Sequence, residues 1–454
     1  MAMETLNPAT GKSIRTFETW GESRLQQVLQ EVAEASPQWR STAMEQRAKL
    51  MTKAATELRD NISHYAGLIT LEMGKPIKES KGEIEKCAWV CDYYAENAAT
   101  FLADELIESD AGKSFVTYLP LGTVLAVMPW NYPFWQVMRF AAPGLMAGNT
   151  GVLKHASNVP QCALAIEDVF RKAGFPENVF RALMIPASQV KGVIEDARIH
   201  AVTLTGSEPA GRQVAATAGN AIKKSVLELG GSDAFVVLED ADLEAAATAG
   251  VASRFLNNGQ SCIAAKRFIV VESIADEFLK LFKQKIEALK VGDPAQDDTD
   301  LGPMSRRDLR DEMHKQVQDS IKQGAVAALG CQPIEGPGAY YQPSILDNVT
   351  PAVRAYGEEL FGPVAIVIRA KDEDDALRIA NDSRFGLGGS AWTQDINRGE
   401  QFARRMESGA TFVNGPVKSD PRLPFGGIKA SGYGRELSLH GIREFVNAKT
   451  IWIK

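Results

Sequence analysis

The fold is decided by one stretch, Val124-Leu125-Ala126-Val127-Met128-Pro129-Trp130-Asn131-Tyr132-Pro133. Residues 124–128 form a short apolar run, as in a strand buried on both faces, and a helical pattern follows over 133–147. Further strands are predicted at 150–153, 201–205, 225–229, 234–238, 268–271, 364–368 and 411–414. Further helices are predicted at 159–173, 207–219, 241–258, 273–289, 306–323 and 396–407. This alternation predicts an α/β fold in which helices cover parallel sheets.

Three other regions indicate how the chain is organised. Residues 21–100 carry apolar side chains at helical spacing and are predicted to be helical. The pair Gly230-Gly231 separates two α/β blocks and marks a domain boundary. The stretch 105–122 fits neither block, so we expect a β-hairpin or extended arm with 449–454 as its candidate partner strand.

The composition is that of an ordinary globular protein. The chain has 454 residues, 45% apolar and 24% charged, and at roughly 150 residues per domain it allows about two to four domains. Its formal net charge is −7 and it has no basic run, so we expect no nucleic-acid partner. No apolar run reaches about 18 residues, and no signal-peptide pattern opens the chain. We therefore expect a cytoplasmic protein without a membrane span.

The cysteines are few and fit a reducing compartment: Cys87, Cys91, Cys162, Cys262 and Cys331. Cys87 and Cys91 lie four residues apart on a predicted helix, but no His is near to complete a zinc site, so no metal is expected. Cys262 differs from the others, because it ends the polar turn Asn257-Asn258-Gly259-Gln260-Ser261-Cys262. A nucleophilic cysteine needs such partial exposure and nearby donors.

Two other polar side chains stand where chemistry is plausible. Glu228 lies in an apolar strand end, where a carboxyl is costly unless it is paired or has a raised pKa that suits a general base. Asn131 lies between a strand and a helix, and its amide can donate to a developing oxyanion. Each residue alone is weak evidence.

Two glycine motifs resemble nucleotide-binding loops only in part. The run Gly386-Leu387-Gly388-Gly389-Ser390-Ala391 matches a dinucleotide fingerprint, but it follows a helical segment, so we interpret it as a glycine turn. Gly206 and Ser207 end a strand and open a helix, so backbone amides there can face a pyrophosphate or simply form a capped turn.

Taken together and in order, these motifs resemble the aldehyde dehydrogenase superfamily over nearly the whole chain. The motifs are Pro-Trp-Asn-Tyr-Pro (129–133), Leu-Lys-His (153–155), Thr-Gly-Ser (205–207), Leu-Glu-Leu-Gly-Gly (227–231), Gly-Gln-Ser-Cys (259–262), Glu-Glu-Leu-Phe-Gly-Pro (358–363) and Pro-Phe-Gly-Gly-Ile-Lys-Ala-Ser-Gly (424–432). Within the superfamily the chain looks most like the bacterial NADP-dependent enzymes that oxidise succinate semialdehyde.

The resemblance implies two Rossmann-type domains with parallel sheets and a β-arm for oligomerisation. The cofactor-binding domain would take residues 1–104 and 123–230, the catalytic domain 231–429, and the arm 105–122 and 430–454. A homodimer or homotetramer is the expected assembly.

The resemblance also implies roles for single residues. Cys262 would be the nucleophile that forms a thiohemiacetal and then a thioester, Asn131 would stabilise the oxyanion, and Glu228 would activate the hydrolytic water. The expected cofactor-binding residues are Lys154, Ser157, Trp130, Gly206, Ser207, Leu229, Glu359 and Phe361.

Ser157 bears on the choice of cofactor. NAD-preferring relatives often carry Glu three residues after the Lys that Lys154 matches, and a carboxylate there would repel a 2′-phosphate. The Ser157 hydroxyl can bind that phosphate, although it can also merely cap the following helix. We therefore expect NADP, with NAD used more weakly.

The substrate prediction rests on Arg139, Trp135 and Ser419. Many succinate-semialdehyde enzymes carry Arg six residues before the nucleophile, but here that residue is Leu256. Arg139 is the one charged residue in 133–145 and lies eight residues after Asn131, so both can face one pocket. Ser419 matches a position that binds the substrate carboxylate, and Trp135 can form a pocket wall or a core aromatic.

Two alternatives remain open on sequence grounds. The chain can act on another short aldehyde, with Arg139 paired inside the protein. It can also be a non-catalytic family member that serves as a binding protein, although the joint presence of Cys262, Glu228 and Asn131 argues against this.

Overall fold

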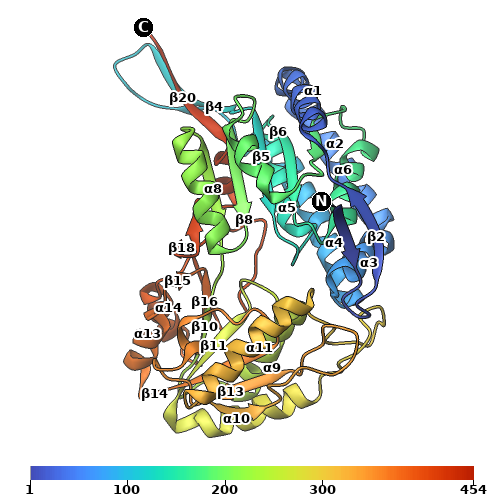
Figure 1. The fold of residues 1–454 in the computed structure, drawn as a ribbon. Coiled ribbons are helices and arrows are strands. Elements are labelled where there is room, and N and C mark those ends of the chain that lie inside the picture. The colour runs from blue at the N-terminus through green and yellow to red at the C-terminus, as the bar shows by residue number, and fades with distance from the viewer. Residues whose placement is uncertain (1) are drawn as a thin grey trace.

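The structure, a computed structural model, describes residues 2–454 and contains two α/β lobes, one above the other in Figure 1. The upper lobe has a six-stranded sheet of order β19-β9-β8-β5-β6-β7, parallel except for β19. Its strands are β5 (Thr123–Met128), β6 (Thr150–His155), β7 (Phe180–Ala182), β8 (Ala201–Thr205), β9 (Lys224–Glu228) and β19 (Gly432–Tyr433).

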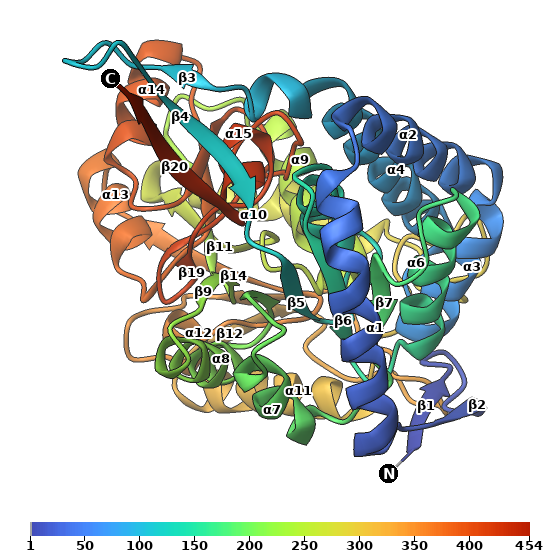
Figure 2. The same cartoon turned by 90° about the horizontal axis from the view of Figure 1, so that it is seen from above.

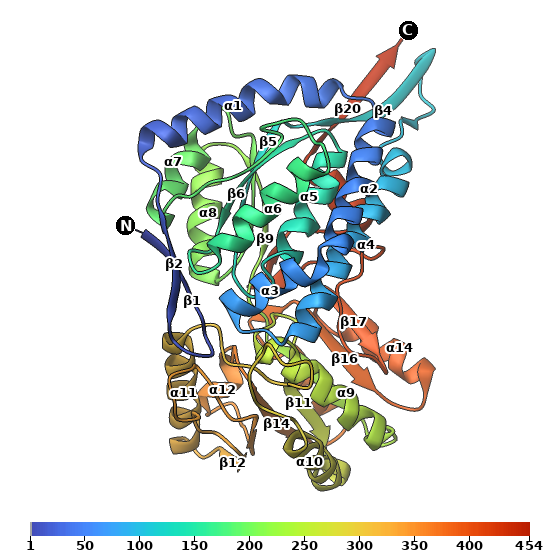
Figure 3. The same ribbon diagram turned by 90° about the vertical axis from the view of Figure 1, so that its right-hand side faces the viewer.

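Helices cover both faces of this sheet. The helices are α1 (Glu22–Ser41), α2 (Met44–Asp60), α3 (Ile62–Met73), α4 (Ile77–Phe101), α5 (Trp135–Met146), α6 (Pro160–Lys172), α7 (Val190–Glu195), α8 (Glu208–Asn220) and α15 (Ser438–Arg443), with a 3-10 turn at Ala187–Gln189. Val124, Ala126 and Met128 of β5 pack against α2–α6, while Leu125 packs on the opposite face with α1, α7 and α8. Figure 3 shows α1 running along the outside of this lobe. Burial on both faces explains the uninterrupted apolar run at 124–128.

The lower lobe has a seven-stranded sheet of order β12-β13-β14-β11-β10-β16-β17, parallel except for β12. Its strands are β10 (Asp233–Val237), β11 (Ala265–Val271), β12 (Val326–Leu329), β13 (Ser344–Asp347), β14 (Val364–Ala370), β16 (Gly388–Trp392) and β17 (Ala410–Val413). On one face lie α9 (Leu243–Phe255) and α10 (Glu272–Glu287). On the other lie α11 (Arg307–Lys322), α12 (Arg354–Gly357), α13 (Glu373–Asn381) and α14 (Ile396–Arg405).

A three-stranded arm projects from the upper lobe, away from the lower one (Figure 1). It consists of β3 (Glu105–Leu106), β4 (Lys113–Pro120) and β20 (Val446–Ile453), and β20 pairs antiparallel with β4 over its whole length. The pairing of 105–122 with the last strand is as expected. The expected second half of the arm, 430–454, is too long, because β19 pairs with β9 in the upper sheet before the chain enters the arm.

Two small β-pairs complete the fold. The hairpin β1 (Ala2–Leu6) and β2 (Ser13–Glu18) lies at the N-terminal end, near α1 and α3 in Figure 2. The pair β15 (Phe385–Gly386) and β18 (Ile428–Lys429) links the segments between the lobes. In residues 2–454 no helix is long and apolar enough to span a membrane.

The eight predicted strands all appear, with ends shifted by a few residues, but two other sequence predictions are wrong. The run 386–391 is not a glycine turn, because Gly388–Trp392 forms β16, a fully buried strand between β10 and β17. Glycine is needed there because a Cβ on Gly388 would lie 2.6 Å from a carboxylate oxygen of Asp233. The helix predicted over 241–258 ends at Phe255, where the chain turns into a short 3-10 segment, Leu256–Gly259.

Candidate active site

Cys262 lies where two cavities meet. One cavity, of about 270 Å³, is lined by α4, the start of α5 and the 417–419 loop. The other, of about 320 Å³, is lined by the 129–131 turn, the start of α8, and Glu359 with Phe361. Cys262 and Gln136 are the two side chains that line both cavities, so a group bound in each would meet at the thiol.

The turn before Cys262 has an unusual backbone that explains why α9 stops. Asn257 and Asn258 adopt left-handed φ values of 57° and 56°, which asparagine tolerates better than most residues. Gly259 also has a positive φ, and a Cβ there would collide with the backbone of Gly362. The turn is therefore pressed against the 358–363 segment, so the two motifs hold each other in place.

Buried hydrogen bonds fix this turn. The Asn257 side-chain amide donates to the carbonyl oxygens of Asn131, at 2.8 Å, and Gln260, at 2.9 Å. Arg254 is fully buried and donates to the carbonyls of Leu360 and Val364, each at 2.8 Å, as well as to those of Gly259 and Gly362. An arginine with only carbonyl partners thus ties the thiol's turn to the neighbouring loop.

The Cys262 thiol is protonated at neutral pH. Burial raises its pKa to about 12, while the positive charges of Arg139 and Lys266 act in the opposite direction. Lys266 donates to the carbonyl oxygens of Ser261 and Cys262, each at 2.8 Å, and its ammonium lies 3.1 Å from a carboxylate oxygen of Glu359. A buried lysine therefore links the backbone of Cys262 to Glu359.

Asn131 lies beside the thiol's turn. Its side-chain nitrogen donates to the carbonyl of Gln260 at 3.1 Å, and the residue lines the second cavity together with Cys262. Since a primary amide has two N–H groups, one proton remains available to an acceptor in that cavity.

Glu228 does not line either cavity but lies in a buried acidic cluster behind them. Burial raises its pKa well above the usual value, the nearby Glu436 raises it further, and Arg139 opposes both. Neither carboxylate oxygen of Glu228 has a hydrogen-bond partner in residues 2–454. Two buried carboxyls thus share one arginine, whose Nε lies 2.7 Å from Glu436.

The second cavity gathers most of the residues predicted to bind the cofactor: Trp130, Gly206, Ser207, Leu229, Glu359 and Phe361. Trp130 and Phe361 meet edge to face with ring centroids 5.9 Å apart. Helix α8 begins here, and no side chain caps its N-terminus. Its first backbone N–H groups can therefore bind an anion, such as a pyrophosphate.

Lys154 and Ser157 are not among the residues that line this cavity. Lys154 is nearly buried at the end of β6 and has no hydrogen-bond or ion-pair partner in residues 2–454, and burial lowers its pKa. Ser157 is exposed and lines a separate cavity of about 500 Å³ with Arg306 and Arg307. It does not cap α6, whose N-cap is Val159 without a side-chain hydrogen bond.

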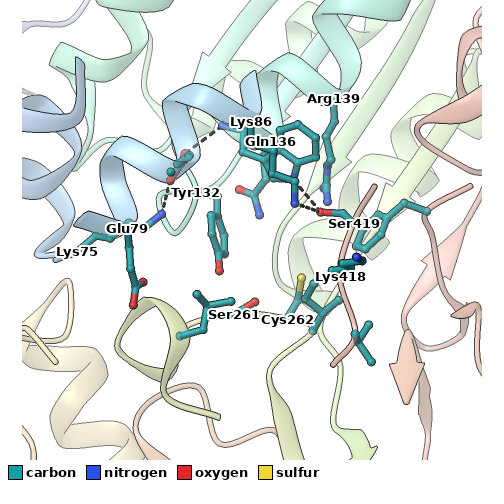
Figure 4. A pocket seen from close by; sticks show the side chains of 17 residues that line it. Lys75, Glu79, Lys86, Tyr132, Gln136, Arg139, Ser261, Cys262, Lys418 and Ser419 are labelled. Atoms are coloured by element: carbon teal, nitrogen blue, oxygen red, sulfur yellow. Dashed lines mark hydrogen bonds and ion pairs between the residues drawn. The ribbon is translucent and has the colours of Figure 1, made fainter. Parts of the chain in front are cut away.

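The first cavity is lined by the three residues predicted to bind substrate, and Figure 4 shows Arg139 and Ser419 beside the space above Cys262. Trp135 donates to the Ser419 hydroxyl oxygen at 3.1 Å. Arg139 is buried, with its guanidinium 4.5 Å from the Phe425 ring centre in addition to its pair with Glu436. The alternative substrate prediction, another short aldehyde, assumed that Arg139 is paired inside the protein, and the structure shows such a pair.

Comparison with known proteins decides the family. The family model described as "Aldehyde dehydrogenase family" matches residues 1–451. The chain belongs to the aldehyde dehydrogenase family. It is 51% identical over 453 residues, 100% of both chains, to a "Probable succinate-semialdehyde dehydrogenase [NADP(+)]" of Synechocystis sp.. It is 50% identical over 459 residues, all of this chain and 97% of the relative, to a "Succinate-semialdehyde dehydrogenase [NADP(+)]" of Mycobacterium avium.

Solved structures agree with this assignment. The succinic semialdehyde dehydrogenase from Streptococcus pyogenes in complex with NADP+ superposes with a TM-score of 0.98 at 38% identity, covering 100% of both chains. A structure described in terms of cofactor and substrate selection by Gox0499 superposes with a TM-score of 0.99 at 41% identity, also over 100% of both chains. The predicted α/β aldehyde dehydrogenase fold is confirmed.

The sequence reasoning missed some residues of this aldehyde dehydrogenase. Lys75, Glu79, Glu83 and Lys86 line the first cavity from one side of α4 and the turn before it. Burial raises the pKa of Glu79 to about 7, and a backbone N–H of Asn257 donates to it at 2.7 Å. The spacing of 79, 83 and 86 on one helix is the signal that places three charged side chains on one face.

Proposed function

We propose that this aldehyde dehydrogenase oxidises succinate semialdehyde to succinate with NADP as hydride acceptor. The observation that carries the proposal is the position of Cys262 at the junction of two cavities. One cavity presents a helix N-terminus and an aromatic pair, and the other presents cations and a serine hydroxyl. The relatives named as NADP-dependent succinate-semialdehyde dehydrogenases support the same substrate and cofactor.

In the proposed chemistry the Cys262 thiol gives up its proton to water, and its sulfur attacks the aldehyde carbon to form a thiohemiacetal oxyanion. The free N–H of the Asn131 amide and the backbone N–H of Cys262 would stabilise the resulting oxyanion. NADP, when bound, accepts the hydride that leaves this carbon. The thioester then takes up water, and the overall reaction converts aldehyde, water and NADP⁺ into carboxylate, NADPH and two protons.

Glu228 is the proposed base for the hydrolytic water. Because it lies in the buried cluster with Glu436, its action as a base requires the side chain to rotate into the cavity beside Cys262. Burial raises its pKa, which makes its carboxylate a stronger base than an exposed one.

The proposed NADP site uses the second cavity and the end of β6. The N-terminus of α8 at Gly206 and Ser207 would receive the pyrophosphate, and Glu359 the ribose hydroxyls of the nicotinamide half. Trp130, Leu229 and Phe361 would form apolar walls. Lys154, an unpaired cation, would attract a 2′-phosphate. The hydroxyl of Ser157, which does not cap α6, would donate a hydrogen bond to it.

The proposed substrate residues are Arg139, Trp135 and Ser419, which surround the first cavity. We further propose a cytoplasmic location and a homodimer or homotetramer that uses the arm. Small molecules, rather than nucleic acid or membrane, are the proposed partners, in keeping with the net charge of −7.

A steady-state screen of short aldehydes with both cofactors tests this function. We expect the highest kcat/KM for succinate semialdehyde with NADP, a lower value for butanal, and no oxidation by Cys262→Ala, which should still bind NADPH by fluorescence. Loss of the nucleophile should cost several orders of magnitude in rate, roughly 10⁴-fold or more. A wild-type preference for butanal would favour the neutral-aldehyde alternative. Full activity of Cys262→Ala would remove the covalent mechanism.

A further inference from the structure

The cations around the first cavity differ in whether they already have a carboxylate partner. Lys75 pairs with Glu83, Arg139 pairs with Glu436, and Lys418, which also lines the cavity, is exposed to solvent. Lys86 has no carboxylate within ion-pair distance in residues 2–454, because its neighbour Glu83 is engaged elsewhere and Asp420 pairs with Arg422. A partly buried ammonium without a counterion is costly, unless a ligand supplies the negative charge.

Lys86 is held in place by neutral contacts alone. Its ammonium donates to the Ser419 hydroxyl oxygen at 2.8 Å and lies 4.4 Å from the centre of the Trp135 ring. Figure 4 shows Lys86 and Arg139 on the wall of the cavity that faces Cys262 and Ser261. The lysine therefore has a defined position with hydrogen-bonding capacity left over, since an ammonium carries three N–H groups.

Ser419 adds a second unused donor at the same point. Its hydroxyl oxygen accepts from both Lys86 and Trp135, and the residue is only 5% exposed. A hydroxyl has one proton, and none of the hydrogen bonds formed by residues 2–454 uses it. With both lone pairs occupied, this proton can only be donated, so the site offers two donors and a positive charge to an acceptor.

We propose that Lys86 supplies the charge that holds the distal carboxylate of the aldehyde substrate, with the Ser419 hydroxyl as the second donor. This rests on the proposed function and names the residue on which its substrate choice depends. One carboxylate oxygen would accept from the Lys86 ammonium and the other from Ser419, with the Trp135 ring as the side wall. Arg139, already neutralised by Glu436, would contribute a more distant charge rather than the principal ion pair.

The surrounding charges agree with an anionic ligand at this point. Burial, and after it the positive charge of Arg139, lower the pKa of Lys86 to about 8. A carboxylate bound to Lys86 would offset both effects with its negative charge, so substrate binding would stabilise the ammonium form. Leu256, where related enzymes carry arginine, also lines this cavity and supplies apolar surface for the carbon chain.

The test compares Lys86→Met with wild type on two substrates of equal chain length. We expect kcat/KM for succinate semialdehyde to fall roughly 30- to 150-fold, mainly through KM, because a charge-assisted hydrogen bond is lost. Butanal, which has no carboxylate, should change by less than about 3-fold. Lys86→Arg should recover most of the loss. Lys81→Met makes the same chemical change on the exposed side of α4, where Lys81 pairs with Asp297, and should affect neither substrate.

The outcomes separate this assignment from the proposed function. If wild type does not prefer succinate semialdehyde to butanal, the proposed function fails. If it does prefer that substrate but Lys86→Met lowers kcat/KM equally for both, Lys86 has a structural role and the assignment is overturned. Lys86→Gln covers the case in which the methionine variant does not fold, because equal losses on both substrates in the glutamine variant overturn the assignment as well. If neither variant changes kcat/KM for succinate semialdehyde, the assignment is overturned and Arg139 is the residue that binds the distal carboxylate.

Discussion

At the residue scale, burial disfavours the charged form of both groups that are expected to react. Burial raises the pKa of Cys262 to about 12, and it raises that of Glu228 well above its usual range. The two groups are also separated, since Glu228 lies with Glu436 and Arg139 rather than in the cavities beside the thiol. We therefore expect proton removal to be coupled to binding and side-chain movement, with Glu228 acting after the hydride has left.

Glu228→Gln should allow one hydride transfer and then stop at the thioester. We expect a burst of about one reduced cofactor per active site, followed by a steady-state rate lower by roughly 10²- to 10⁴-fold. Because the pKa of Glu228 is raised and its base form grows as pH increases, the wild-type steady-state rate should rise with pH and the variant's should not. Stopped-flow absorbance measures both phases. A burst and a steady state slowed equally would place Glu228 in thiol activation instead.

A site residue could be predicted when the local sequence around it is unusual, and could not when its role depends on tertiary contacts. Cys262 and Asn131 stand in motifs whose local sequence is unusual, and the structure brings both to the same cavity. Lys86 carries no such signal, because its importance comes from a missing partner, and pairing is a property of the tertiary fold. The structure likewise pairs Arg139 with Glu436, a residue nearly three hundred positions away that the sequence patterns did not single out.

At the element scale, strands buried on both faces were predictable, while glycine-rich backbone was not. The apolar residues of β5 and β8 are stable only when both faces of the strand are buried, so their sequence predicted the parallel sheet. The run at β16 looks like a turn because its two glycines carry no side chains. Only the structure shows that they allow close approach of Asp233 and Met406. The end of α9 was missed for a similar reason. Asn257 and Asn258 adopt left-handed backbone angles there, and an asparagine in a sequence does not by itself indicate that conformation.

The loop between β6 and α6 is where we expect cofactor preference to be set. Ser157→Glu should reverse a preference for NADP, because its carboxylate would repel the 2′-phosphate and pair with the unpartnered Lys154. We expect the ratio of kcat/KM for NADP over NAD to fall roughly 5- to 150-fold. Ser157→Ala is the matched control, which removes the hydroxyl without adding charge and should cause a smaller fall. A wild-type enzyme that favours NAD would contradict the reasoning from this position.

At the scale of the whole molecule, the arm leaves the edge of one strand, β20, without a pairing strand in a single chain. The two sheets are covered on both faces, whereas β20 lies at the edge of the arm and pairs only with β4. Leu106 is 75% exposed, and Trp452 and Ile453 are about half exposed on the same arm. An edge strand with exposed large apolar side chains is a site for association with another chain. The arm is therefore the surface where we expect a second copy to bind.

Replacing Trp452 and Ile453 together by Glu should dissociate the expected dimer or tetramer, because two buried charges at an interface are costly. Light scattering coupled to gel filtration measures the mass, and the variant should elute at the monomer mass at micromolar concentrations where wild type stays associated. Ile222→Glu is the control, since Ile222 is 94% exposed on the turn after α8 and belongs to none of the arm's strands, so the same kind of change there should leave the mass unaltered. The arm variant should keep its helical circular dichroism, because neither tryptophan nor isoleucine belongs to the buried clusters of the two lobes. A wild-type monomer, or an arm variant of unchanged mass, would mean that the exposed strand does not join copies of this chain.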